Sequence, residues 1–417
     1  MMAERAPPPE DTEYSLQPVP LVARLSLMAT ILLWASLTLD PSAPYLASWW
    51  GSSFPFVVFL VGTIVANLVL SIFSSLSGYI ASKEGLTYAL ATEKVYGSKG
   101  AAIPAFWAGI VSVGWLAFSI GVVAEGIQSM LSLPAWLYYL IALLMVLLFM
   151  VTAYLGVKHI VKLAMIGVPL LIILIVAGVG LSTSKYGTPQ MGSFDASLLP
   201  VVFGLVLGTF VNGSIVLSFD YQRFCRRPKD AVLTAFTNFL IFWSFIIILS
   251  GIPAAVLGKD LYGTYVQLGL RALAIVTLFI LAWTSADNQL YSSSLSWTLG
   301  VKTLGSTVDR RKVVFVAAAL TVILSWVKLH TFAVSWLSLL TSVSLPAGVV
   351  LWTDYFLVSK GRWTERNMVA NYQAFLSWFL GSVTIWYLHV HRQFWYGILA
   401  GFLVTFIVYY IIGPRRK

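Results

Sequence analysis

The chain has 417 residues and a formal net charge of +10; 59% of its residues are hydrophobic and 10% are charged. So few charged side chains cannot cover the surface of a soluble domain, and the composition therefore predicts a polytopic membrane protein in contact with the lipid bilayer. The one cysteine, Cys225, excludes an intramolecular disulfide.

Residues 1–22 are expected to form a cytoplasmic N-terminal tail. The segment contains PPPEDTEY (7–14) and QPVP (17–20). It has no basic stretch followed by a short apolar core and a small-residue cleavage site, so we predict no signal peptide.

Apolar windows of about 20 residues, divided at polar or Gly/Pro clusters, predict twelve transmembrane helices. Their approximate ranges are 23–50, 54–80, 101–130, 134–156, 158–182, 195–221, 230–258, 269–299, 312–329, 331–357, 367–389 and 394–413.

The basic residues are distributed unevenly over the connections between these spans. Of the 26 Lys and Arg, all are predicted on the same side of the membrane as the N-terminus except Lys185, Lys259, Arg271, Lys328 and Arg392. The positive-inside rule therefore predicts a multi-pass plasma-membrane protein with both termini in the cytoplasm. Because topology explains the basic excess, we expect no nucleic-acid partner.

Two predicted spans are interrupted near the middle of the membrane. Span 1 contains Asp40-Pro41, and span 6 contains FVNGS (210–214). An Asp at mid-membrane costs about 2.5–3.5 kcal/mol, and a proline removes a backbone donor. Interruptions at matching places in two groups of five spans predict a five-plus-five inverted repeat. Repeat one covers about 23–182 and repeat two about 195–357, with accessory helices 11 and 12 and a basic tail in 358–417.

A helix broken inside the membrane exposes backbone N–H and C=O groups that need a partner. We therefore interpret Asp40, Asn212 and Gly213 as parts of a central binding site, where half-helix ends offer partial charges to a ligand and a cation. The alternative is a structural kink in which Asp40 pairs with another polar residue for packing alone.

Several blocks along the chain resemble those of one transporter family. These are GYIASKEGLT (78–87), VGWL (113–116), GTFVN (208–212), DYQRF (220–224), WTSADNQLY (283–291) and DYFL (354–357). By their order and spacing the chain resembles the nucleobase:cation symporter-1 family, in particular its cytosine permeases. The resemblance covers about residues 25–417. It implies a LeuT-like inverted-repeat fold with broken helices 1 and 6, alternating access, and symport of a planar heterocycle with Na⁺ or, in some relatives, a proton.

The resemblance also implies where such a ring would bind. The tryptophan of the family's span 3 motif corresponds to Trp115, and the aromatic residue of span 6 corresponds to Phe210. Two aromatic faces bind a flat ring by stacking and leave its polar edge free for hydrogen bonds. We therefore expect Trp115 and Phe210 to cover the two faces of the substrate.

Sodium in this family lies between span 1 and span 8. The hydroxyl pair of the family's span 8 motif corresponds to Thr284 and Ser285, and oxygen ligands suit a hard cation. Carbonyls of span 1 near Trp34, Ser36 and Thr38 would complete the site. The alternative is that both hydroxyls bond to carbonyls one turn back in their own helix.

The sequence departs from cytosine permeases around the expected ring edge. Ser112 stands where they have a glutamine, and Ala286 where they have an asparagine, so two hydrogen-bond partners are lost. Asp40 and Asn212 stand where they have smaller residues. These changes argue against cytosine itself and favour a related amino-heterocycle, such as a hydroxymethylpyrimidine, a thiamine-like compound or another nucleobase, with proton coupling through Asp40 as an alternative.

Other functional classes fit the pattern less well. A membrane enzyme is expected to show clustered acids, a His-rich metal set or a nucleophile with its base; here the acids are scattered and the four histidines show no ligand spacing. A channel usually repeats a pore-lining element. We therefore predict a secondary transporter without a cofactor, in which Glu125 lies near the outer end of span 3.

Overall fold

The computed structural model describes residues 14, 16–38, 40–155, 158–364 and 366–414. Residues 1–13 and 15 of the predicted N-terminal tail and the basic residues 415–417 lie outside the described residues. The described part is built from α-helices joined by short 3₁₀ and π-helical segments. An isolated β-bridge joins Leu25 to Cys225.

The first seven α-helices are separated by short connections. Their bounds are α1 Leu27–Thr38, α2 Ser42–Ser53, α3 Phe56–Glu84, α4 Tyr88–Tyr96, α5 Ala102–Met130, α6 Leu137–Leu155 and α7 Lys158–Tyr186. The remaining helices are α8 Leu199–Gln222, α9 Pro228–Phe236, α10 Ser244–Leu257, α11 Leu261–Gln267, α12 Arg271–Thr303, α13 Arg310–Trp326, α14 Ala333–Thr353, α15 Tyr372–Ile385 and α16 Gly397–Ile412.

Five shorter helical segments lie beside the α-helices. Leu21–Ala23 and Leu329–Phe332 are 3₁₀ helices, whereas Thr237–Trp243, Asp354–Val358 and Trp386–His391 are π-helical. The first π segment joins α9 to α10, so that one long helical element corresponds to predicted span 7. π-Helical turns are rare and often mark functional sites.

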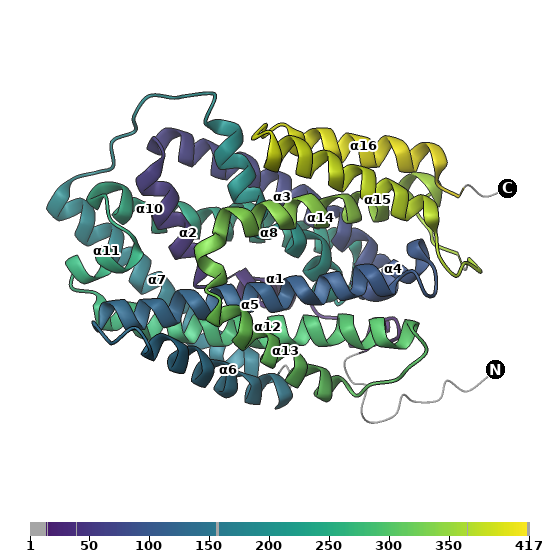
Figure 1. Cartoon of the computed structure of the whole chain (residues 1–417), viewed down its shortest axis with the longest axis horizontal. Coiled ribbons are helices and arrows are strands. Elements are labelled where there is room, and N and C mark those ends of the chain that lie inside the picture. Colours follow the sequence, from purple (N-terminus) through teal and green to yellow (C-terminus); the bar gives the residue numbers. More distant parts are fainter. Residues whose placement is uncertain (1–13, 15, 39, 156–157, 365, 415–417) are drawn as a thin grey trace.

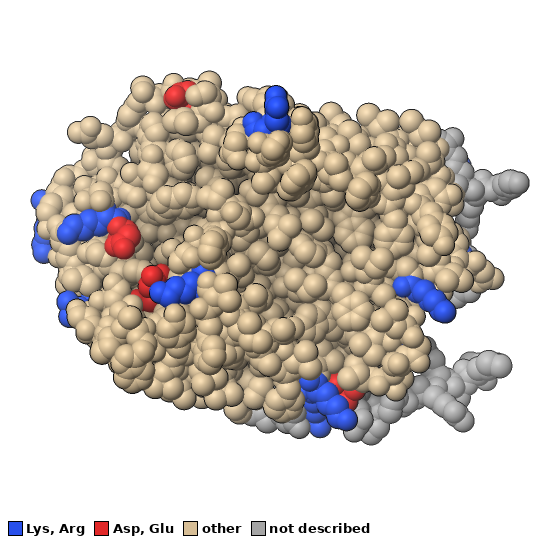
Figure 2. Space-filling view, in the orientation of Figure 1, with Lys and Arg blue, Asp and Glu red and all other residues tan. Residues whose placement is uncertain are grey.

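Each of the twelve predicted spans corresponds to a helical segment of the structure. Seven segments within the described residues are long and apolar enough to cross a membrane, and the apolar helices at 137–151 and 397–412 are shorter. The count of twelve crossings stays a prediction. On the face shown in Figure 2, charged side chains are few and lie towards the ends and rim, as expected for a surface in contact with lipid.

The predicted break in span 1 is confirmed. Helix α1 ends at Thr38 and α2 begins at Ser42. The amide of Asp40 donates to the Thr38 carbonyl at 3.0 Å, and the Asp40 carbonyl accepts from Ala43 at 3.1 Å. Pro41 has no N–H group to continue the helical ladder, so the chain turns here and starts a second half-helix.

The predicted break in span 6 is wrong, because α8 runs without interruption from Leu199 to Gln222. The polar residues of FVNGS find partners without opening the helix. Ser214 donates to the Val211 carbonyl at 2.8 Å, and Asn212 accepts from Ser344 of α14 at 2.9 Å. Sideways bonding to a neighbouring helix satisfies a polar side chain in the membrane and leaves the backbone ladder intact.

Helices from the two halves of the chain pack against one another. Helix α3 lies along α8, α5 along α12, and α2 along α10. Small residues allow the closest of these approaches: a Cβ on Gly51 of α2 would lie 2.5 Å from the carbonyl oxygen of Gly251 in α10. In Figure 1, α15 and α16 run together along one edge of the bundle, and α6 and α13 along the opposite edge.

One end of the bundle holds α4 and both ends of the described chain (Figure 1). Arg24 is buried there and donates to the carbonyls of Ser82 and Cys225, and the Val19 amide donates to the Gly85 carbonyl. These contacts attach the segment before α1 to the end of α3 and to the α8–α9 connection. Helix α11 lies at the opposite end.

Candidate functional site

The centre of the candidate site is the carboxylate of Asp40, in the turn between α1 and α2. Asp40 is only 8% exposed. Its Oδ1 accepts from the Ser42 amide at 2.8 Å, so it caps the first turn of α2. The Ser119 hydroxyl of α5 lies 2.9 and 2.8 Å from the two carboxylate oxygens, and the Ser285 hydroxyl of α12 donates to Oδ2. Three helices therefore meet at one buried carboxylate.

Asp40 is hydrogen-bonded, but it forms no ion pair with any of the described residues. The ion pairs among those residues include Arg227–Asp230, His330–Glu125 and Arg366–Asp354. A buried negative charge is costly unless a cation or a proton offsets it. The position therefore suits a cation, a proton or a positively charged substrate.

The two hydroxyls predicted to bind sodium have different partners. Ser285 donates to Asp40, whereas Thr284 donates to the Leu281 carbonyl at 2.9 Å in its own helix. On the other side of the site, the Thr38 hydroxyl lies 3.5 Å from the Trp34 carbonyl and 3.1 Å from Asn238 Oδ1. The side chain of Ser36 lies outside the described residues.

The side-chain groups bonded to the Asp40 carboxylate are the hydroxyl oxygens of Ser119 and Ser285. This chemistry fits Na⁺, which takes carboxylate, hydroxyl and carbonyl ligands. Among the described residues, no group of three or more His, Cys, Asp or Glu could hold a metal ion. The Na⁺ ligand set stays a prediction, centred on Ser285 and Thr284.

Both aromatic residues predicted to bind the ring are buried in the same apolar cluster. Trp115 is 8% exposed and Phe210 is 6% exposed. The Trp115 ring meets Phe118 edge to face at 5.3 Å. Phe210 meets Phe239 at 5.3 Å and Trp243 at 4.8 Å, again edge to face. That Trp115 and Phe210 cover opposite faces of one substrate stays a prediction.

The remaining predicted residues lie in different surroundings. Ser112 is buried, and its hydroxyl has no hydrogen-bond partner among the residues that the structure describes. Asn212 points its amide oxygen to α14, as described above. A Cβ on Gly213 would lie 2.5 Å from the Phe210 ring, so this glycine leaves room for that ring. Ala286 packs in the second apolar cluster with Val113 and Leu116, and not in the cluster of Trp115 and Phe210.

Sequence reasoning missed Ser119 and the π-helical segment Thr237–Trp243. Ser119 follows Ser112 by seven residues and Trp115 by four, so all three lie on one face of α5. This periodicity was a signal that pointed to Ser119. The π segment supplies Asn238, Phe239 and Trp243, and an apolar run gives no sign of a change from α- to π-helical winding.

A polar layer continues from the site towards the end that holds α4. Asn288 donates to the Thr284 carbonyl at 2.8 Å and accepts from the Tyr221 hydroxyl at 3.2 Å. Asp220 accepts from the Ser292 hydroxyl and the Tyr88 amide, each at 3.0 Å. These bonds tie α4 and α8 to α12, and they position the turn of α12 that carries the candidate ion ligands.

Comparisons with known proteins agree with this architecture. The chain is 31% identical over 386 residues to the cytosine permeases of Escherichia coli strain K12 and of Escherichia coli O157:H7, covering 89% of this chain and 88% of each relative. No family model matches the chain.

Solved structures with the same fold include three transporter structures. The inward-facing conformation of Mhp1 has a TM-score of 0.74 at 15% identity, over 94% of this chain and 91% of Mhp1. Mhp1 in a closed conformation with bromovinylhydantoin bound, described as a nucleobase-cation-symport-1 family transporter, has a TM-score of 0.73 at 16% identity, over 94% and 93%. A Na⁺-coupled sialic acid symporter has a TM-score of 0.70 at 14% identity, over 95% and 92%.

These comparisons confirm the LeuT-like inverted-repeat fold and identify the chain as a multi-pass membrane transporter, not an enzyme. The length of the match to the cytosine permeases, together with the fold shared with Mhp1, shows that the chain belongs to the nucleobase:cation symporter-1 family.

Proposed function

We propose that this protein is a secondary transporter that imports a planar nitrogen heterocycle together with a cation. The observation that carries the proposal is the buried Asp40 carboxylate at the break between α1 and α2, bonded to α5 and α12. A helix break at mid-membrane with an uncompensated acid is a place where substrate and ion can bind together. The names of the relatives support a nucleobase or a related pyrimidine as the substrate.

Trp115 and Phe210 are proposed to stack on the ring, with Asp40, Ser112, Asn212 and Gly213 near its edge. The unpartnered hydroxyl of Ser112 is available to a ligand. A carboxylate accepts hydrogen bonds, so Asp40 suits an edge that donates, such as an exocyclic amine. A site that keeps buried polar groups for such an edge discriminates strongly against a ring that lacks it.

Na⁺ is the proposed coupling ion, held by Ser285, Thr284 and oxygen atoms of span 1. A second candidate is symport of a cationic amino-heterocycle, coupled to a proton through Asp40. One observation bears on this candidate: the Ser285 hydroxyl, a proposed Na⁺ ligand, is bonded to the Asp40 carboxylate in the structure. A protonated Asp40 would lose its charge and still be able to hydrogen-bond to both serines.

The division of the chain into a transport core and accessory helices is also a proposal. Residues 23–357 would form the transport core, and 358–417 would add accessory helices to it. The predicted orientation places the end with α4 in the cytoplasm of a plasma-membrane protein.

The experiment that tests the function is a thermal-shift panel on the detergent-purified protein. Cytosine, uracil, hypoxanthine, hydantoin, hydroxymethylpyrimidine and thiamine are each tested in Na⁺ and in K⁺. A ligand that binds only the folded state raises the Tm, and linkage makes the shift larger when the coupled ion is present. A sodium-dependent shift with one ring supports the proposal, and a shift that follows pH instead supports the second candidate.

A variant shows whether the ligand occupies the proposed site. Trp115→Ala is expected to abolish the ligand-dependent shift, because it removes one stacking face. Trp136→Ala is the matched control, since Trp136 is 62% exposed on the surface. No shift with any ring in the panel, or an unchanged shift in Trp115→Ala, contradicts the proposed function.

A further inference from the structure

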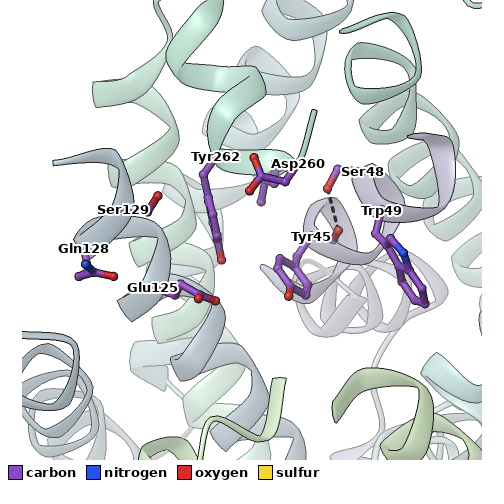
Figure 3. Close-up of a pocket in the computed structure, with 9 residues that line it drawn as sticks. Tyr45, Ser48, Trp49, Glu125, Gln128, Ser129, Asp260 and Tyr262 are labelled. Carbon is purple, nitrogen blue, oxygen red and sulfur yellow. Dashed lines mark hydrogen bonds between the residues drawn. The ribbon is translucent and has the colours of Figure 1, made fainter. Parts of the chain in front are cut away.

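A cavity of about 430 Å³ opens at the end of the bundle that holds α11. It lies between α2, α5 and the start of α11, and the predicted orientation places this end outside the cell. Figure 3 shows Tyr45 and Trp49 of α2 on one side, with Glu125 of α5, Asp260 and Tyr262 facing them. Its volume is in the range of small-molecule binding sites.

Glu125 is held in place at this cavity by a buried histidine. Its Oε2 lies 2.6 Å from His330 Nε2. His330 is fully buried in the 3₁₀ segment before α14, and a Cβ on Gly121 would lie 2.2 Å from its Nδ1. The imidazole is therefore packed tightly against α5 and holds one carboxylate oxygen of Glu125. The Glu125 side chain is 29% exposed, so it remains accessible from the cavity.

Asp260, directly before α11, contributes a second carboxylate to the lining of the cavity. Its Oδ1 caps α11 by accepting from the Gly263 amide at 2.8 Å. Both acids influence the same group, the Tyr262 hydroxyl. Burial raises the pKa of Tyr262, and the charges of Glu125 and Asp260 raise it further. Glu125 and Asp260 therefore place two acidic groups at the cavity. Lys328 is the basic side chain that acts on Glu125, and its Nζ lies 4.6 Å from the Tyr138 ring centre.

Aromatic rings form the rest of the cavity. Tyr45 and Tyr262 lie 6.1 Å apart with their planes tilted by 36°. Tyr262 donates to the Val122 carbonyl at 2.7 Å, which fixes its ring on α5. Aromatic faces attract cations when water is excluded. Rings beside two carboxylates suit a flat, positively charged group better than a bare metal ion, an anion or a neutral apolar molecule.

The cavity is adjacent to the candidate central site. Tyr45 packs edge to face on Phe118 at 6.1 Å, and Phe118 packs on Trp115 at 5.3 Å. Ser119, the next residue of α5, bonds to Asp40. Tyr45 and Phe118 therefore form a chain of ring contacts from the cavity to Trp115.

We propose that this cavity is an outer capture site for small planar cations, such as protonated amino-heterocycles or amidinium groups, with Glu125 and Asp260 as the charge partners. The inference goes beyond the proposed function, because binding here requires neither the coupling ion nor transport. Binding in the cavity would concentrate cationic rings outside the central site and would disfavour the binding of anionic rings.

The test uses benzamidine, a planar amidinium at neutral pH, and benzamide, its neutral counterpart of the same shape. Calorimetry on the purified full chain in K⁺ is expected to show binding of benzamidine but not of benzamide. Glu125→Gln and Asp260→Asn are each expected to weaken benzamidine binding by about tenfold, the effect of one lost charge-assisted contact. Asn at position 260 keeps the side-chain oxygen that caps α11, so folding is preserved.

Two control variants separate this site from others. Asp195→Asn removes an exposed acid from the connection between α7 and α8 and is expected to leave benzamidine binding unchanged. Trp115→Ala is expected to retain benzamidine binding, even though the same variant is expected to lose binding of the heterocyclic substrate at the central site. If no heterocycle in the thermal-shift panel binds but benzamidine does, the proposed function is rejected and the capture site is not. Equal binding of benzamide, no binding of benzamidine, or loss of binding in Trp115→Ala would overturn the capture site.

Discussion

The hydroxyl of Ser119 lies 2.9 Å from Oδ1 and 2.8 Å from Oδ2 of Asp40. This pair joins the middle of α5 to the break between α1 and α2. Because the same helix carries Trp115 one turn earlier, movement of the α1–α2 break is mechanically linked to the helix proposed to hold the substrate ring. Ser119 is therefore the first residue to test.

Ser119→Ala is expected to destabilise the ligand-free protein by about 1–3 kcal/mol, because a buried carboxylate loses one of its donors. The measurement is the Tm in detergent. Ser112→Ala is the matched control, since Ser112 is buried on the same face of α5 and its hydroxyl has no partner. Equal Tm changes in the two variants would show that the Asp40 contact contributes nothing to stability.

Asp40→Asn is expected to remove the dependence of substrate binding on the coupling cation. The amide keeps an oxygen for the Ser42 N–H but carries no charge to attract Na⁺ or a proton. The measurement is the ligand-induced Tm shift in Na⁺ against K⁺ and at two pH values. A variant that still shows the wild-type ion dependence would remove Asp40 from the coupling mechanism.

Thr284→Ala is expected chiefly to remove sodium stimulation of uptake into proteoliposomes, with Thr284→Ser as the conservative rescue. The reason is that sodium prefers hydroxyl oxygens and that Ser285 is already bonded to Asp40. If sodium dependence survives in Thr284→Ala, this hydroxyl only bonds to the Leu281 carbonyl, as it does in the structure.

Asp354→Ala is expected to destabilise the protein by about 3–5 kcal/mol, the cost of breaking a buried ion pair. Asp354 is fully buried and is the acceptor of a network that joins α14 to α16. Its donors are Ser359 at 2.9 Å, Trp363 at 2.8 Å, Arg366 at 2.7 Å and Tyr409 at 2.6 Å. The measurement is again the Tm.

The control for Asp354 is Asp309→Ala. Asp309 is exposed and caps α13 through the Arg311 amide at 2.9 Å, so its loss is expected to cost about 1 kcal/mol. A Tm change in Asp354→Ala no larger than in this control would mean that the accessory helices are not held by the network.

Cys225 is expected to resist maleimide labelling in the folded protein at pH 7.5. It is fully buried, and burial raises the pKa of its thiol from 9.0 to about 11. The neutral thiol is favoured below that pH, which leaves about a hundredfold less of the reactive thiolate. Mass spectrometry of the single cysteine is the measurement, with SDS-denatured protein as the control. Rapid labelling of native protein would show that the α8–α9 connection opens.

Local features of the sequence were enough to predict the order of the helices, the family and the break at Asp40. Long apolar runs predict helices because every backbone group in lipid must be bonded internally. Asp40-Pro41 interrupts such a run by its own covalent structure, whatever packs around it. The same reasoning failed at FVNGS (210–214), because an Asn, a Gly and a Ser permit a break without requiring one, and a bond from Ser344 of α14 satisfies Asn212.

Only the tertiary structure decided which side chains meet. Asp40 bonds to Ser119 and Ser285, which are 79 and 245 residues away from it in the sequence. The outer cavity combines residues of α2, α5 and α11. Such contacts depend on the rotation of each helix about its axis, which is set by packing over its whole length. The sequence alone determined that an acid lies at the break; the packing of α5 and α12 determined that the hydroxyls of Ser119 and Ser285 face it.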